Sequence, residues 1–170
     1  MKKALILFLI LSTSSILNAQ SYPESATEVG FNFGVLNRYH SNMDQGRDED
    51  GYPAYRFGTI VQQRYNVFIL SQNLSIEHGG VYDETYFNVG GGSGLAILNK
   101  RDFRIDVLLG CGVDLSPQIP APWFRPTLSG ELSAYYKNFR ISLASRAALG
   151  IIEGYAETGI TIGYLLRQGI

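Results

Sequence analysis

Apolar and polar residues alternate along most of this chain, which is the two-residue period of a β-strand whose two faces meet different surroundings. Between residues 103 and 115, Phe103 and Leu109 share one face, whereas Arg104 belongs to the other. The same alternation predicts eight strands, at residues 27–39, 54–63, 66–78, 84–98, 102–115, 125–137, 139–151 and 155–167. The third strand is the least regular, because Val67 and Ile69 fall on its polar face. The pattern predicts an all-β chain with one domain.

The connections between the predicted strands are of two kinds. Long polar stretches follow the first, third and fifth strands, at residues 40–53, 79–83 and 116–124. Tight turns follow the second, fourth and sixth strands, near Arg64-Tyr65, Asn99-Lys100-Arg101 and Lys137-Asn138, and a short loop near Glu153-Gly154 follows the seventh. Long loops at one end and tight turns at the other are typical of an antiparallel up-and-down transmembrane β-barrel.

The two faces of the predicted strands differ in a way that favours a lipid environment. The apolar faces carry no charged residue, and the polar faces are rich in Gly, Ser and Asn. A charge on the lipid face of a barrel costs about 2–4 kcal/mol at the middle of a bilayer, so an uncharged face is what lipid requires. An eight-stranded interior also has no room for all the large apolar residues. We therefore expect the apolar face outside, although a soluble ligand-binding barrel with that face inside is the alternative fold.

Charged residues on the polar faces nearly balance, which predicts a paired network inside the barrel. The arginine fork suits such sites because it can bind a carboxylate at two points. The predicted network consists of Glu28, Arg38, Arg56, Arg64, Glu77, Arg104, Asp106, Asp114, Glu131, Arg140, Arg146, Glu157 and Arg167. Aromatic residues near the strand ends of the apolar face are expected to form the girdles typical of membrane barrels; they are Tyr55, Phe57, Phe103, Tyr136, Phe139 and Tyr164.

The N-terminus has the layout of a secretory signal peptide. Two lysines precede the unbroken apolar run 4–11, and a mixed segment leads to Ala19. The apolar run is far shorter than the ~20 residues that span a bilayer, so we expect a cleaved leader rather than an anchor. We predict a signal peptide at residues 1–19 and a mature barrel at residues 20–170. Residue 20 is Gln rather than Cys, which argues against a lipoprotein.

Composition excludes several functional classes. The net charge of −1 gives no basic surface for nucleic acid. The single cysteine, Cys111, excludes an internal disulfide framework and a cysteine-based metal cluster. Cys111 falls on the apolar face, where we expect it to act as packing. We expect neither a cofactor nor a metal.

The last predicted strand carries the closest approach to a motif. Outer-membrane barrels often end in a polar-x-Gly-x-x-apolar-x-apolar signal, and residues 157–164 fit it through Glu157, Gly159, Ile162 and Tyr164. Many such proteins end on an aromatic residue, whereas this chain continues to Ile170. Over essentially its whole mature length, the chain resembles the small eight-stranded outer-membrane β-barrels of Gram-negative bacteria, the OmpA/OmpX-like class. The resemblance implies contact with outer-membrane lipid and recognition by the barrel assembly machinery.

Few residues suggest catalysis. Outer-membrane lipid A deacylases of the PagL type use a His and a Ser separated by one residue, whereas His40 and Ser41 are adjacent here. Neighbours in a strand point to opposite faces, so these two share a site only if the strand has ended before them. His78, beside Glu77, is the other candidate, as a proton shuttle or metal ligand with Asp83 or Glu84.

Two further segments resemble binding motifs without matching them. The acidic residues at 44 and 48–50 are interrupted by Arg47 and lack the spacing of a calcium loop. The glycine-rich run 90–94 lacks the Gly-Lys-Ser/Thr ending of a phosphate-binding loop, and we expect its glycines to allow curvature or close packing in a strand.

The sequence therefore predicts a filled outer-membrane barrel rather than an open pore, with a structural or interaction role. Its loops at 40–53, 79–84 and 116–124 would bind an extracellular or periplasmic protein partner, and the proline-rich segment before Trp123 is the stiffest of them. An outer-membrane enzyme acting on lipid, with His40, Ser41 or His78 as catalytic residues, is the alternative function.

Overall fold

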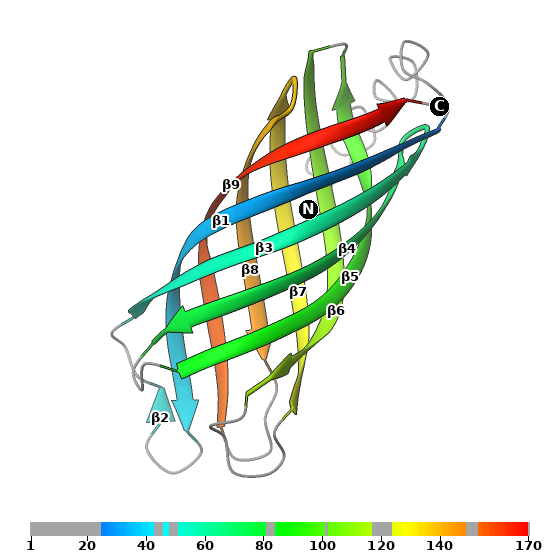
Figure 1. Cartoon of the computed structure of the whole chain (residues 1–170). Helices are drawn as coiled ribbons and strands as arrows, with labels where there is room; N and C mark the ends of the chain where they lie inside the picture. Colours follow the sequence, from blue (N-terminus) through cyan, green and yellow to red (C-terminus); the bar gives the residue numbers. More distant parts are fainter. Residues whose placement is uncertain are drawn as a thin grey trace, which may run out of the picture.

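The structure is a computed structural model that describes residues 25–42, 46–47, 51–80, 84–100, 102–116, 124–148 and 153–169. These residues form strands throughout, joined by turns (Figure 1). The strands are β1 (Ser25–Asn42), β2 (Gly46–Arg47), β3 (Tyr52–Tyr65), β4 (Phe68–Gly79), β5 (Glu84–Asn99), β6 (Phe103–Leu115), β7 (Phe124–Tyr136), β8 (Phe139–Ala148) and β9 (Glu153–Gly169). None of the described residues forms a helix long and apolar enough to cross a membrane.

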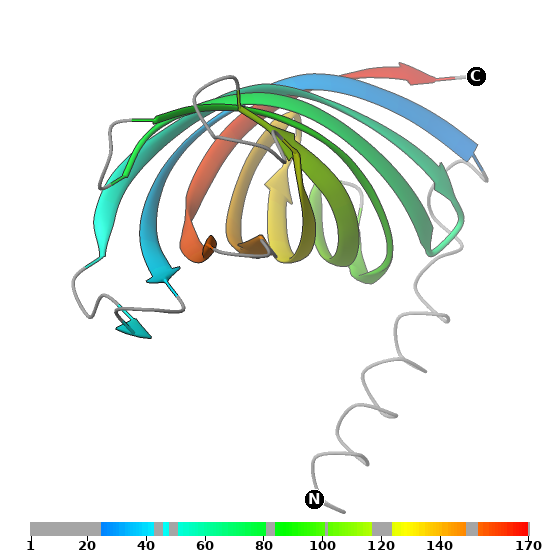
Figure 2. The same ribbon diagram turned by 90° about the horizontal axis from the view of Figure 1, so that it is seen from below.

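Eight of the described strands close into an antiparallel barrel. Each strand pairs with the next along the chain, and β1 pairs with both β3 and β9, so the sheet has no open seam. The closing ladder runs from Ala26 opposite Gly169 to Asn42 opposite Glu153. Figure 2 shows the sheet curving back on itself, and β2 extends the pairing of β1 beyond the barrel wall. The predicted eight-stranded up-and-down transmembrane topology is confirmed.

The large apolar side chains lie outside the barrel. Phe57, Phe68 and Leu109 expose 59%, 63% and 70% of their surface, and similar residues occupy alternate positions of all eight strands. Most charged side chains of the same strands are buried instead. The soluble barrel is therefore wrong for this chain, since it would require the two faces to be exchanged.

The strands differ from the prediction mainly at their ends. The first strand extends three residues past the predicted end at residue 39, so His40 lies in β1 rather than in a loop. The pair Glu153-Gly154, predicted as a loop, begins β9 opposite Asn42 and Ser41. These extensions have one cause: β1 and β9 continue to pair beyond the apolar belt, where alternation no longer marks a strand.

Two of the predicted turns can be compared residue by residue. The turn at Lys137-Asn138 is where it was expected, with Lys137 at φ 53°. The prediction of a turn near Arg64-Tyr65 is wrong, because β3 continues through both residues. The chain reverses at Asn66, which has φ 59°. Asparagine tolerates this left-handed conformation better than most residues.

A bulge in β5 shifts the faces at its end. The pairing with β6 passes from Ala96 directly to Leu98. Ile97, which was predicted to point outward, is the extra residue of the bulge. Asn99, predicted in a turn, is thereby the last strand residue and is buried. A bulge adds one residue to one strand and re-aims those that follow.

Small apolar clusters fill the interior near the tight turns. Ile69 points inward from β4 and packs with Ala96 and Leu108. The glycine run 90–94 lies within β5 rather than before a helix, and a side chain on several of its glycines would meet the backbone of β6. The glycines thus let adjacent strands approach closely.

Candidate functional site

Charged side chains fill both ends of the barrel interior. We name them by the end they occupy: the loop-end cluster lies toward the long connections, and the turn-end cluster lies toward the tight turns. The loop-end cluster comprises Arg38, Arg56, Arg146, Glu77, Glu157, Asp114 and Tyr155. The turn-end cluster comprises Glu28, Arg64, Arg104, Asp106, Glu131, Arg140, Gln62, Asn99 and Tyr135.

The loop-end cluster is built around two glutamates that share three arginines. Arg38 Nη2 lies 2.8 Å from Glu77 Oε2 and 3.0 Å from Glu157 Oε2. Arg56 binds the same two carboxylates, with Nε 2.6 Å from Glu77 Oε1 and Nη2 2.5 Å from Glu157 Oε1. Arg146 Nη2 lies 2.9 Å from Glu157 Oε1 and also contacts Glu77. Every oxygen of both glutamates therefore has a cationic partner.

Strand pairing places these residues together. Arg38 is opposite Glu157 in the β1–β9 ladder, and Arg56 is opposite Glu77 in the β3–β4 ladder. Arg146 on β8 also pairs with Glu157. Opposite charges on directly paired positions face the same side of a sheet, so the register brings the two glutamates to one level of the barrel.

Aromatic rings enclose the guanidinium of Arg38. Its Cζ lies 4.6 Å from the ring centre of Tyr86 and 4.5 Å from that of Tyr155. The Tyr155 hydroxyl donates a hydrogen bond to Asp114 and accepts one from Arg146. Cation–π contacts are strongest where water is excluded, and Arg38 is fully buried.

The turn-end cluster centres on Arg104. Its Nη1 and Nη2 donate to the two oxygens of Glu28 at 3.0 and 2.9 Å, and its Nε lies 2.8 Å from Asp106 Oδ2. The ring of Tyr135 packs against the same guanidinium at 3.8 Å. Arg64 Nη1 approaches Glu28 Oε1 at 3.7 Å. The cluster is completed by Arg140, which donates to Glu131.

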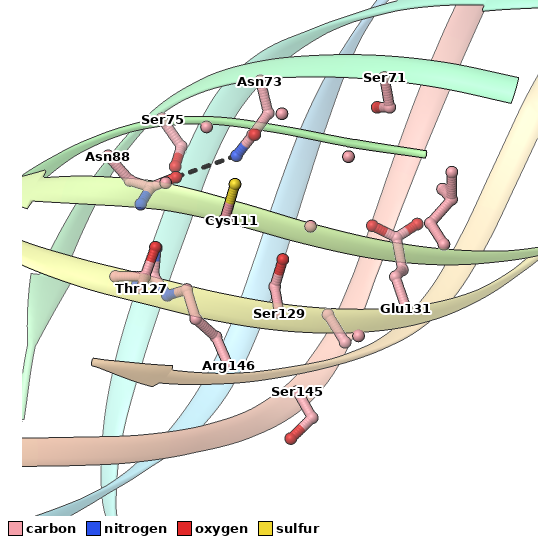
Figure 3. Close-up of a pocket in the computed structure, with 18 of the residues that line it drawn as sticks. Ser71, Asn73, Ser75, Asn88, Cys111, Thr127, Ser129, Glu131, Ser145 and Arg146 are labelled. Atoms are coloured by element: carbon pink, nitrogen blue, oxygen red, sulfur yellow. Dashed lines mark hydrogen bonds between the residues drawn. The ribbon is translucent and has the colours of Figure 1, made fainter. Parts of the chain in front are cut away.

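A cavity of about 70 Å³ lies between the two clusters (Figure 3). Glycine backbone from β5 and β6 and small polar side chains line it, including Asn73, whose Nδ2 donates to Asn88 Oδ1 at 3.0 Å. Arg146 borders it from the loop-end cluster and Glu131 from the turn-end cluster. The space suits a few water molecules, because its walls offer hydroxyl and amide groups.

Almost all of the residues predicted for the interior network belong to one of the two clusters. Arg167 pairs with Glu28 in the β1–β9 ladder, but its side chain lies outside the described part of the structure. The sequence prediction missed buried Arg125, opposite Asp114, and the inward tyrosines Tyr86, Tyr135 and Tyr155. The two-residue alternation would have placed these tyrosines inside the barrel. Tyr155, for example, lies two residues before Glu157 and therefore on the same face of the strand.

The structure does not assemble the candidate catalytic residues. His40 and Ser41 are consecutive residues of β1, opposite Tyr155 and Gly154, so the strand has not ended before them. Glu77 is buried inside the barrel, whereas its neighbour His78 is exposed and its Nδ1 lies 3.0 Å from Thr85 Oγ1. Within the described residues, no group of three His, Cys, Asp or Glu side chains could hold a metal ion. Asp83 and the acidic residues at 44 and 48–50 lie outside those residues.

The residues of the C-terminal signal lie on β9 with separate environments. Glu157 belongs to the loop-end cluster, whereas Ile162 and Tyr164 are exposed on the outer face. A side chain at Gly159 would meet the backbone of β1, with the Leu36 Cα at 2.6 Å. The sequence pattern thus follows the inside–outside alternation of the closing strand.

Comparisons with known proteins agree on the fold. No family model and no curated protein matches the chain. Among solved structures, Neisserial surface protein A shares 9% identity at a TM-score of 0.50, covering 84% of this chain and 99% of that one. Ail, the attachment invasion locus protein of Yersinia pestis, shares 13% at 0.46, covering 82% and 98%. A de novo designed transmembrane β-barrel shares 14% at 0.44, covering 79% and 95%. The match to Neisserial surface protein A, together with the closed barrel, shows that the chain has the fold of the small eight-stranded outer-membrane β-barrels of Gram-negative bacteria.

Proposed function

We propose that this chain is an outer-membrane protein with a filled interior that acts through its loops as an interaction or adhesion protein. Residues 1–19 would direct export and be removed, and residues 20–170 would insert in the membrane. The barrel assembly machinery would recognise β9 through Glu157, Gly159, Ile162 and Tyr164. The loops at 40–53, 79–84 and 116–124 would then bind a protein partner outside the cell.

The segregation of apolar and charged side chains carries the proposal. Phe57, Leu109 and Phe139 project from different strands with more than half of their surface exposed, and they belong to a continuous apolar outer wall. Soluble monomers rarely expose large contiguous apolar areas. In a bilayer the same wall is fully solvated by acyl chains, and a closed barrel satisfies every wall hydrogen bond without water.

The interior argues against an open pore. The two clusters cross the lumen at two levels, and Arg38, Glu77 and Arg104 are completely buried. The space between the clusters is only about 70 Å³. The side chains of the two clusters therefore fill the lumen where an open channel would have to pass.

The position of the loops supports a binding role for that end of the barrel. The three long connections all leave the barrel at the end where β1, β4, β6 and β8 finish, whereas tight turns close the other end. Loops on a rigid scaffold are where binding residues concentrate. The pairing of β2 with β1 extends this end beyond the barrel wall, with Ser41 opposite Arg47.

Fractionation and surface labelling test the proposal. The full chain, expressed with its own leader in a Gram-negative host, should appear in the outer-membrane fraction and migrate differently on gels before and after heating. In a Cys111→Ser background, Asp48→Cys should react with a membrane-impermeant maleimide on intact cells, and the matched Asp102→Cys in a tight turn should not. Recovery in the soluble periplasm, or labelling at residue 102 alone, would contradict it.

The interaction role needs its own measurement. A non-adherent host strain displaying the chain should bind cultured human epithelial cells more than the empty strain. Replacing residues 43–50 or 117–122 by Gly-Ser linkers of equal length should reduce binding with no change in the heat-dependent gel shift. Equal adhesion by empty and displaying strains would remove the adhesion role while leaving the membrane assignment intact.

A further inference from the structure

An apolar groove of about 590 Å³ crosses the outer surface of the barrel over β7, β8, β9 and β1, and its lining reaches Phe103 of β6 and Phe57 of β3. Its floor is a row of paired residues, in which Tyr135 is opposite Arg140, Arg140 is opposite Gly163, and Gly163 is opposite Asn32. The side chains of Tyr135, Arg140 and Asn32 are buried toward the interior, so backbone forms the floor. Gly163 has the same inward parity, since a Cβ there would lie 3.6 Å from the Asn32 Cβ.

Two rows of outward side chains form the walls of this groove. On the turn side, Tyr136, Phe139, Tyr164 and Phe31 follow one another across four strands. The rings of Phe139 and Tyr164 meet edge to face, with centres 5.2 Å apart and planes at 78°, which holds this wall in place. The opposite wall continues from Ala134 across to Phe33 and Phe57.

The two ends of the groove differ in polarity and position. One end lies at the β7–β8 turn, where Lys137 Nζ is 5.6 Å from the ring centre of Tyr136. Asn138 Nδ2 donates to the Tyr164 hydroxyl at 3.3 Å at the same end. The other end, at Phe57, lies midway along β3 (Tyr52–Tyr65). The groove therefore runs from a cationic rim toward the middle of the barrel wall.

We propose that this groove is a binding site for one membrane phospholipid, with an acyl chain along the groove and the phosphate against Lys137. The proposal rests on membrane insertion as argued above. A phospholipid is the occupant that matches both features, since it joins an anionic group at the membrane surface to a chain that enters the bilayer. The volume lies in the range of about 300–1,000 Å³ typical of ligand sites. Asp102 of the neighbouring turn lies beside Lys137, because its backbone oxygen accepts the Lys137 backbone N–H at 2.8 Å, and both residues are exposed.

Native mass spectrometry of the folded barrel, extracted from vesicles of palmitoyl-oleoyl phosphatidylglycerol, tests the site. We expect one phospholipid to remain bound after detergent removal. Palmitoyl-oleoyl glycerol, which lacks the phosphate, and glycerol phosphate, which lacks the chains, should each be retained at least threefold less. Lys137→Gln should lower phospholipid retention by at least threefold, and Ala134→Phe, which fills the groove, should abolish it.

Matched variants separate a specific site from the ordinary lipid shell. Lys100→Gln removes a cation from another turn, and Leu132→Phe enlarges the adjacent outward position of β7; both should retain the lipid as the wild type does. Equal retention by all variants would overturn the site while membrane insertion stood. A chain that fails to enter the vesicles, judged by an absent heat-dependent gel shift, would overturn the proposed function and the lipid site together.

Discussion

Arg104 and Glu28 join opposite walls of the barrel. The guanidinium on β6 donates two hydrogen bonds, of 3.0 and 2.9 Å, to the carboxylate on β1, and in the closed sheet these strands are four places apart in either direction. Glu77 on β4 and Arg146 on β8 stand in the same relationship at the loop end. Each pair acts as a brace across the full width of the lumen.

The first prediction concerns the Arg104–Glu28 brace. Glu28→Ala leaves the Arg104 charge buried with Asp106 as its carboxylate partner among the described residues. Breaking a buried pair in this way costs about 3–5 kcal/mol. We expect that loss in the free energy of unfolding, measured by urea titration of the barrel in lipid vesicles. The matched variant Asp102→Ala, which removes an exposed carboxylate from a turn, should change it by less than about 0.5 kcal/mol.

The double variant Glu28→Leu/Arg104→Leu separates the cost of leaving the Arg104 charge unpaired from the net contribution of the ion pair to stability. Replacing both members of a buried ion pair by apolar residues is often neutral or stabilising, so much of the lost stability should return. A double variant as unstable as Glu28→Ala would contradict the unpaired Arg104 charge as the cause of the lost stability.

The second prediction concerns the outer wall. Leu109 is the centre of the outward row of β6, and Leu109→Arg should cost about 2–4 kcal/mol in vesicles, because a charge there must leave water. Tyr65→Arg, at the turn end of β3, should cost only about 0–1 kcal/mol. The comparison uses the same urea titration, and equal effects at the two positions would contradict a lipid-facing Leu109.

The third prediction concerns the close approach of β5 and β6. A Cβ at Gly94 would collide with the Val107 carbonyl oxygen and lie 2.8 Å from the Leu108 Cα. Gly94→Ala should therefore destabilise the barrel by about 1–3 kcal/mol, the usual cost of overpacking. Gly130→Ala is the control, since its nearest neighbour would be the Leu109 side chain at 3.7 Å. A thermal gel-shift midpoint that moves equally for both variants would refute the steric explanation.

Alternation predicted which residues face inward but not which of them meet. Arg104 and Glu28 were both assigned to the interior, yet their contact depends on the stagger of the closed sheet, which no local pattern contains. Tyr135 was missed for a different reason, because residue type alone does not place a tyrosine: its ring is apolar enough for the outer wall, and its hydroxyl donates to Gln62 inside, 3.2 Å away. Only its parity within β7 decides between the two.

The alternation of apolar and polar residues did not predict the strand ends or the bulge in β5, for a different reason. His40 and Gly154 lie past the lipid belt, where both faces of a strand meet polar surroundings and alternation disappears. At Ile97, β5 carries one residue more than β6. The pairing passes from Ala96 opposite Asp106 directly to Leu98 opposite Ile105. The bulge is a property of the pairing between two strands, so the sequence around residue 97 alone does not predict it.

Cys111 offers the most direct test of the account, because it is the only cysteine and lies exposed on the outer face of β6. A small fluorophore attached to it in the folded, vesicle-inserted barrel reports the surroundings of the wall. We predict strong quenching by phospholipids brominated along their acyl chains and little quenching by aqueous iodide. Quenching by iodide, with none from brominated chains, would contradict the claim that the apolar face of this barrel contacts lipid.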